Sequence, residues 1–152
     1  MPITLAWMGQ QAPRLEVAHV QRRGKRLTAV GTQLGAVYEL HYRLASTRLS
    51  LEVVGRRSLE VDLTDADFFD LGWSPLFNSL PVIRDGLLEQ GPLRSYVMRW
   101  VDVPSLEIHM SEQVYEPMGE GLVRFRAGTF TADIQFDEAG LVVDYPGIAT
   151  RL

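Results

Sequence analysis

The amino-acid sequence predicts an all-β domain of antiparallel strands, and three observations predict it. Apolar and polar residues alternate with a period of two over much of the chain, which is typical of strands with one buried face. Glycine-based turn signals recur about every ten residues. Helical patterns are short. This rhythm favours a sandwich, or a sheet closed or nearly closed into a barrel, over alternating strands and helices.

Alternation identifies the expected strands of the first half of the chain. In residues 37–44, the apolar side chains share one face, and residues 48–53 and 58–63 repeat the pattern; the face of the first segment consists of Tyr38, Leu40, Tyr42 and Leu44. Before them stands a basic cluster, Arg22-Arg23-Gly24-Lys25-Arg26. We interpret this cluster as a solvated hairpin turn between two strands, with contact to an anionic head group as the alternative.

The second half contains the most regular strand pattern. Residues 106–110 and 123–126 alternate, and residues 130–137 do so without interruption. A shift of one residue would expose the whole apolar set. We therefore predict that Thr131, Asp133 and Gln135 face outward and that four side chains face the interior, namely Phe130, Ala132, Ile134 and Phe136.

A different kind of segment connects these halves. Residues 64–81 form a long, aromatic-rich connection. Helical structure is expected to be limited to a turn or two in residues 64–71 and, beyond the connection, in residues 85–89. Within the connection, Trp73–Pro81 is expected to be ordered without regular secondary structure, because its prolines restrict the backbone. The Asn78 amide is expected to bond backbone groups that lack a strand partner, with direct ligand contact as the alternative.

Composition limits the kinds of protein that this chain can be. The chain has 152 residues, a formal net charge of −4, 46% hydrophobic residues and no cysteine. We expect a single domain over residues 1–152, without disulfides or thiolate metal sites, and a reducing, cytoplasmic location. Neither a signal peptide nor a membrane-spanning segment is expected. The absence of a basic excess argues against a nucleic-acid partner.

The sequence carries no visible catalytic constellation. His19, His41 and His109 lack metal-ligand spacing, and the two last named fall on polar faces of expected strands. There is no nucleophile motif and no phosphate-binding loop. The acidic residues Asp62, Asp65, Asp67 and Asp70 are typical of a solvated or capping cluster. We expect no cofactor, no metal, no catalytic residue and no enzymatic activity.

Several bulky residues suggest core or binding positions. Trp7, Trp73 and Trp100 carry an indole N–H that needs a partner when buried. Arg43 and Arg99 alternate with apolar residues. Such an arginine either points into water or, inside a barrel, faces a polar ligand group.

Motifs along the chain resemble one protein family. Over Asp67–Leu152 the matching segments are SPLFNSLPV at 74–82, WVDVPSL at 100–106, QVY at 113–115, FTADI at 130–134 and GLVVDYPG at 140–147. Residues 6–7 and 38–44 match more loosely. In order and spacing these segments resemble the putative glycolipid-binding protein family, a bacterial domain family.

The resemblance implies a strongly curved antiparallel sheet that forms an open barrel, as in bacterial lipoprotein and lipid carriers. It implies an apolar cavity suited to acyl chains. Because no catalytic constellation is visible, we expect this cavity to bind a lipid-like, glycolipid-like or other amphiphilic ligand without catalysis. The expected ligand-binding residues are Trp73, Phe77, Asn78, Arg84, Arg99, Trp100, Gln113 and Tyr145. Two alternatives stay open: a scaffold protein with a filled core, and an enzyme acting on a small apolar substrate. The sequence leaves the oligomeric state open.

Overall fold

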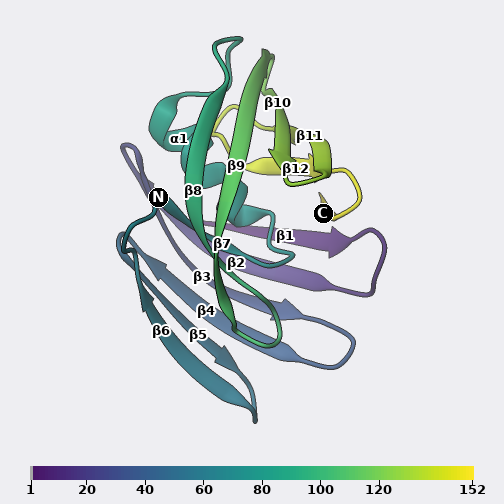
Figure 1. Ribbon diagram of the computed structural model, residues 1–152. Coiled ribbons are helices and arrows are strands. Elements are labelled where there is room, and N and C mark those ends of the chain that lie inside the picture. Colours follow the sequence, from purple (N-terminus) through teal and green to yellow (C-terminus); the bar gives the residue numbers. More distant parts are fainter. Residues whose placement is uncertain (1) are drawn as a thin grey trace.

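A computed structural model describes residues 2–152 as one continuous sheet with a single short helical segment (Figure 1). Strands account for 58% of the chain, which confirms the all-β prediction. The strands are β1 Ile3–Gly9, β2 Leu15–Arg23, β3 Arg26–Leu34, β4 Glu39–Ala45, β5 Arg48–Val53, β6 Arg57–Asp62, β7 Phe68–Leu71, β8 Arg94–Val101, β9 Ile108–Gly119, β10 Leu122–Ala127, β11 Phe130–Phe136, β12 Val142–Tyr145 and β13 Ala149–Arg151.

The strand order makes an open sheet. It runs β6-β5-β4-β3-β2-β1-β13-β12-β11-β10-β9-β8-β7. Neighbouring strands are antiparallel except β7 and β8, which are parallel. Among the described residues, the edge strands β6 and β7 do not pair with each other. The strongly curved sheet is therefore an open barrel, not a closed one.

The sheet curls into two arms, which we define as the first arm (β1–β6) and the second arm (β7–β13). In Figure 1, β8 and β9 run steeply across the strands of the first arm. Register shifts interrupt the second arm between Leu122 and Val123 and between Gln135 and Phe136. Such bulges increase the local twist of a sheet. The short strands β12 and β13 continue the second arm from β11, and β13 joins the two arms by pairing with β1.

The space between the arms is filled by side chains. One core cluster joins Leu40 and Leu49 of the first arm to Phe69, Phe77 and Val101, all at most 2% exposed. A second cluster lies under the second arm and includes Tyr96, Tyr115, Phe125 and Ile134. Burying one such side chain stabilises the fold by about 1.5–3 kcal/mol.

Alternation is confirmed along most strands. Strand β4 alternates strictly, with Leu40, Tyr42 and Leu44 buried and Arg43 in solvent. In β11, the predicted side chains Ala132, Ile134 and Phe136 are buried. The prediction for Phe130 is wrong, because this side chain at the start of the strand is 40% exposed.

The connection over residues 64–81 differs from its prediction. Residues 64–71 form no helix; Phe68–Leu71 is strand β7, because Phe69 and Leu71 alternate into the core. A 3-10 turn, Leu76–Asn78, and helix α1, Ser79–Asp85, follow. Pro81 fits there because the first turn of a helix needs no N–H donor from it. Gly86 ends the helix at φ +66°.

The predicted order of this segment has a packing reason. Residues 74–79 are all buried, so the segment is part of the core although the prolines suggested an extended path. Helix α1 replaces the irregular structure expected up to Pro81 and places Val82 and Ile83 in the two core clusters. No helix among residues 2–152 is long and apolar enough to cross a bilayer.

Candidate ligand-binding groove

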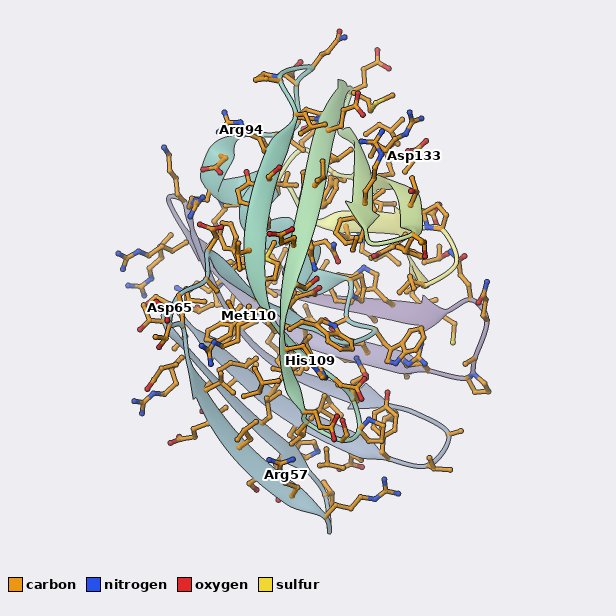
Figure 2. The ribbon with its side chains drawn as sticks, in the orientation of Figure 1. Arg57, Asp65, Arg94, His109, Met110 and Asp133 are labelled. Atoms are coloured by element: carbon orange, nitrogen blue, oxygen red, sulfur yellow. The ribbon has the colours of Figure 1, made fainter. Side chains whose placement is uncertain are left out.

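A groove of about 1220 Å³ opens between the second arm and the loops that face it. Small-molecule sites usually measure about 300–1,000 Å³, so this groove has room for a ligand of lipid size. Its lining is mostly apolar, and Figure 2 shows its Met110 beside His109 on β9, where that strand crosses the first arm.

Two walls enclose the groove. One wall comes from β8, β9, β10 and the start of β11, with Trp100, Ser111, Gln113, Phe125 and Phe130. The other wall comes from three loops that are distant in sequence, and it consists of Gln11, the loop Gly72–Trp73 and the turn Gly147–Ile148.

The loop Gly72–Trp73 holds its indole in the groove at a conformational cost. Trp73 has φ +65° and is 46% exposed. The left-handed region costs a residue other than glycine about 1–2 kcal/mol. Such strain persists only where the surroundings enforce it, and it clusters at functional sites. The Arg14 guanidinium lies 4.3 Å from the centre of the Trp73 ring, a cation–π contact that fixes the indole.

A buried carboxylate enforces this loop conformation. Glu16 of β2 is 2% exposed and accepts hydrogen bonds from Ser74 Oγ at 2.6 Å and Tyr42 Oη at 2.8 Å. Gln33 Nε2 donates to Glu16 Oε1 at 3.0 Å and to the Gly72 carbonyl at 3.2 Å. The groups on both sides of Trp73 are thus tied to the first arm.

Gly31 makes this arrangement sterically possible. Gly31 of β3 pairs with Tyr42 of β4, and a Cβ at Gly31 would collide with the Tyr42 ring. The missing side chain lets the phenol lie flat and reach Glu16. Burial raises the pKa of the Glu16 carboxyl, while the hydrogen bonds from Gln33, Ser74 and Tyr42 oppose that rise.

Gln10 braces the far side of the second wall. Its amide nitrogen donates to Asp144 Oδ1 at 3.1 Å and to Thr150 Oγ1 at 2.8 Å, and its oxygen accepts from the Gly147 N–H at 2.7 Å. The β1–β2 turn and the Gly147 turn therefore hold each other beside the groove.

A chain of polar side chains leads from the groove into the core. Gln113 Nε2 donates to Asp70 Oδ2 at 2.7 Å, and Tyr115 Oη lies 3.4 Å from Gln113 Oε1. Asn78 Nδ2 donates to Tyr115 Oη at 3.1 Å. Asn78 thus bonds a side chain and not the backbone groups we predicted.

Asp70 is the titratable end of this chain. Burial raises the pKa of the Asp70 carboxyl from 3.8 to about 6, and the Gln113 amide opposes the rise. Asp70 lines the groove with Asp102, Glu112 and Arg126. Arg126 pairs with Glu116 at 3.0 Å, so the groove carries no excess of positive charge.

The aromatic floor continues below the polar chain. Phe125 contacts Tyr115, Phe130 and Tyr145 with ring centroids 5.3, 6.1 and 6.1 Å apart. Burial and, to a smaller extent, the Asp70 charge raise the pKa of the Tyr145 hydroxyl, so this phenol is neutral over the working range of pH.

The structure brings together some of the eight expected ligand-binding residues. Trp73, Trp100 and Gln113 line the groove. Asn78 and Tyr145 lie just beneath it, in contact with Tyr115 and Phe125.

The other three residues lie elsewhere. Phe77 is a core residue, 1% exposed and edge-on to Tyr42. Arg84 lies in the last turn of helix α1 and forms a two-point ion pair with Asp85. Arg99 points to the opposite face of β8 from Trp100 and donates to the Thr64 carbonyl at 2.9 Å.

Sequence reasoning missed part of the groove. Asp70 was assigned to a solvated acidic cluster, but alternation within 68–71 places it opposite the buried Phe69 and Leu71. Gln11, Gly147 and Ile148 carry no local signal, because only the β1–β13 pairing brings them to the groove. His41 and His109 are exposed, as their placement on polar strand faces predicts, and His19 is exposed as well. Within residues 2–152, no group of three or more His, Asp or Glu side chains is arranged to hold a metal ion.

The fold and the groove define the class of protein: it is an open-barrel β protein with a lateral, largely apolar groove. Residues 52–151, about two thirds of the chain, match the family described as "Putative glycolipid-binding", and the chain belongs to this family. Its structure is similar to the crystal structure of a DUF1089 family protein from Pseudomonas aeruginosa, with 26% sequence identity and a TM-score of 0.59. That similarity covers 93% of this chain and 79% of the other. No curated protein matches the chain.

Proposed function

We propose that the groove binds an amphiphile with an uncharged, hydroxyl-bearing head group, without a chemical step. The observation that carries this proposal is a mostly apolar groove that ends on the Asp70–Gln113 pair. Trp73, Trp100 and Phe130 would cover the apolar part of the ligand. Burial of a methylene contributes about 0.8 kcal/mol, so a chain of several carbons accounts for useful affinity.

The charges of the groove support a neutral head group. Asp70, Asp102 and Glu112 oppose a single lining arginine, which already pairs with Glu116. A phosphate or sulfate placed there would meet carboxylates of the same sign. A sugar hydroxyl could instead donate to Asp70, and exposed indoles offer flat apolar surfaces for a sugar ring. The description of the family supports the same class of ligand.

One observation favours an enzyme as a second candidate. A carboxyl with a pKa of about 6 inside a groove is suited to general acid–base catalysis. In that case Asp70→Asn would abolish turnover of a glycoside and leave its binding within about threefold of wild type. In the binding proposal, wild type releases no product from the same glycoside.

Titration with alkyl chains of one length and different head groups tests the binding proposal. Tryptophan fluorescence would follow an alkyl glucoside, an alkyl phosphocholine and an alkyl sulfate, each below its micelle concentration. We expect the glucoside to bind at least tenfold more tightly than the sulfate. Trp100→Ala should weaken it by about tenfold or more, as is common when a central aromatic contact is truncated.

Val54→Ala is the matched control, because Val54 is 47% exposed and outside the lining of the groove. Equal binding of all three head groups would contradict the head-group assignment. An absence of binding by any of them would favour a scaffold protein with a filled core. The cytoplasmic location expected from the composition is likewise a proposal, which cell fractionation would test.

A further inference from the structure

The basic cluster of residues 22–26 forms the β2–β3 turn, as predicted, and does not stand alone. Gly24 has φ +63° in this turn. Figure 1 shows the hairpin beside α1, and Figure 2 places Arg94 at the same end of the molecule. A hollow of about 660 Å³ lies between these elements, lined by Arg22, Gly24, Lys25, Ile83, Arg84, Asp85, Gly86 and Arg94.

Positive charge is concentrated at this end. A second hollow of about 230 Å³ shares Lys25 and Arg84 and adds Arg26 and Asp67. Five basic and two acidic side chains line the two hollows, a net charge of +3, whereas the whole chain carries −4. A local charge opposite in sign to that of the protein indicates an anionic partner.

Two of the basic groups, Arg22 and Arg84, are held by hydrogen bonds, and only Arg84 is paired with an acidic side chain. Arg22 donates to the carbonyls of Gly24 at 2.7 Å and Ala139 at 2.9 Å, so its guanidinium keeps its full charge. Lys25 and Arg94 make no side-chain hydrogen bond or ion pair with any residue between Pro2 and Leu152. Only Arg84 is paired, with Asp85 at 3.0 Å.

An apolar crevice borders the basic hollow. It measures about 410 Å³, shares Arg22, Gly24 and Ile83 with the hollow, and is otherwise lined by Ile3, Val20, Leu27, Ala139 and Leu141. Nearby Ile3 is 44% exposed. The other large apolar side chains of the crevice are buried, so Ile3 is the apolar side chain that this surface exposes beside the basic groups. Peripheral membrane-binding surfaces combine positive charge with exposed apolar groups in this way.

We propose that this end of the molecule, the basic face formed by Arg22, Lys25, Arg26, Arg84 and Arg94, docks on a bilayer that contains anionic phospholipids. The face is separate from the groove. Glu16 and Arg22 lie toward opposite ends of the nine-residue strand β2, and Trp100 and Arg94 lie toward opposite ends of β8. Since a strand rises about 3.3 Å per residue, the groove and the basic face lie roughly 20 Å apart.

Vesicle sedimentation tests the proposal. The full chain would be mixed with phosphatidylcholine vesicles that either contain or lack phosphatidylglycerol. We expect binding only to the anionic vesicles, and weaker binding as sodium chloride increases. The double variant Lys25→Glu with Arg94→Glu should weaken binding by at least about 30-fold, given the usual contribution of each basic side chain near such a surface.

The control variant reverses two charges elsewhere. Arg43→Glu with Arg56→Glu alters the net charge equally, at exposed residues away from the hollows, and should bind within about threefold of wild type. An equal loss in both double variants would overturn the proposal, because it would reflect net charge alone. Binding to neutral vesicles as strong as to anionic ones would also overturn it.

Two further measurements separate the docking proposal from related explanations. If inorganic phosphate binds the protein in calorimetry and anionic vesicles do not, the hollow takes a free anion and the docking proposal is wrong. Trp100→Ala should leave vesicle binding unchanged. Failure of the groove to bind an alkyl glucoside therefore contradicts the proposed function alone, and failure to bind anionic vesicles contradicts the docking proposal alone.

Discussion

Glu16 shows how single residues position the groove. Its carboxylate has no solvent contact of consequence, and three side chains donate to it, namely Gln33, Tyr42 and Ser74. A buried carboxyl is costly unless such donors satisfy it. Here the cost is offset, and the result is a rigid link between the first arm and the loop that carries Trp73.

Substitution of Glu16 should therefore act on stability and on the groove together. Glu16→Ala leaves buried donors without an acceptor and should cost about 3 kcal/mol of unfolding free energy. Glu16→Gln keeps one acceptor oxygen and should cost less. Urea unfolding checks both variants. A loss below about 1 kcal/mol for Glu16→Ala would mean that the carboxylate does not brace the loop.

The raised pKa of the Asp70 carboxyl predicts that the stability of the protein depends on pH. This pKa is about 6 in the folded protein and 3.8 when unperturbed. Between these values the folded state binds more protons than the unfolded state, so the free energy of unfolding falls as pH rises. The contribution of Asp70 to the free energy of unfolding is fully present below about pH 4 and is lost above about pH 6. The loss is at most about 3 kcal/mol.

The comparison with Asp70→Asn isolates this effect, because other carboxyls contribute equally to both proteins. The difference in unfolding free energy, wild type minus Asp70→Asn, should decrease between pH 4 and pH 6. A difference that stays constant or increases over that interval would show that the pKa of Asp70 is not raised.

The contacts of Asn78 indicate that its role is structural. Its amide donates to Tyr115 Oη at 3.1 Å, and both residues are buried. Asn78→Ala should lower the melting temperature and cost about 1–3 kcal/mol, since it removes a buried hydrogen-bond partner. Affinity for an alkyl glucoside should fall only as far as stability does. A large loss of affinity at unchanged stability would instead assign Asn78 to ligand contact.

At the scale of elements, alternation carried the prediction of the strands. A period of two identifies one buried face without knowledge of the partner strand, which is why β4 and most of β11 were predicted residue by residue. Phe130 departs from the pattern because strand ends lack neighbours on one side. Helix α1 was missed because the prolines at 75 and 81 suggested extended backbone, whereas a helix accepts proline in its first turn.

Strand β11 allows a direct test of this packing. Ile134 is 0% exposed at the centre of the second core cluster. Ile134→Asp would bury an unpaired carboxylate and should cost several kcal/mol, about 3 or more. The neighbouring Gln135→Asp, on the other face, should cost much less. Equal losses for the two variants, measured by chemical unfolding, would mean that the face assignment is wrong.

At the scale of the whole molecule, the curvature of the sheet creates the groove. The space between the arms is packed, so the proposed ligand site is a lateral groove and not a hollow barrel interior. Sequence reasoning selected Trp100 and Gln113 within recognisable motifs, and Trp73 as an aromatic residue directly before one. It could not find Gln11 or Ile148, because their position depends on which strands meet where the sheet closes its curve.

The molecule also separates two kinds of surface. The groove is apolar with an acidic excess, and the basic face lies toward the other ends of β2 and β8. A protein docked through its basic face would keep the groove away from the anionic head groups. This division agrees with a carrier that meets a membrane with one end and holds a neutral amphiphile with the other.

Native mass spectrometry of the purified protein tests the central claim most directly, because it detects a ligand that stays bound without a choice of probe. We predict an added mass that fragments into a sugar-bearing lipid and that is reduced in Trp100→Ala and unchanged in Val54→Ala. Protein that carries no lipid, and takes up none when incubated with a lipid extract, would contradict the claim that the groove is a lipid-binding site.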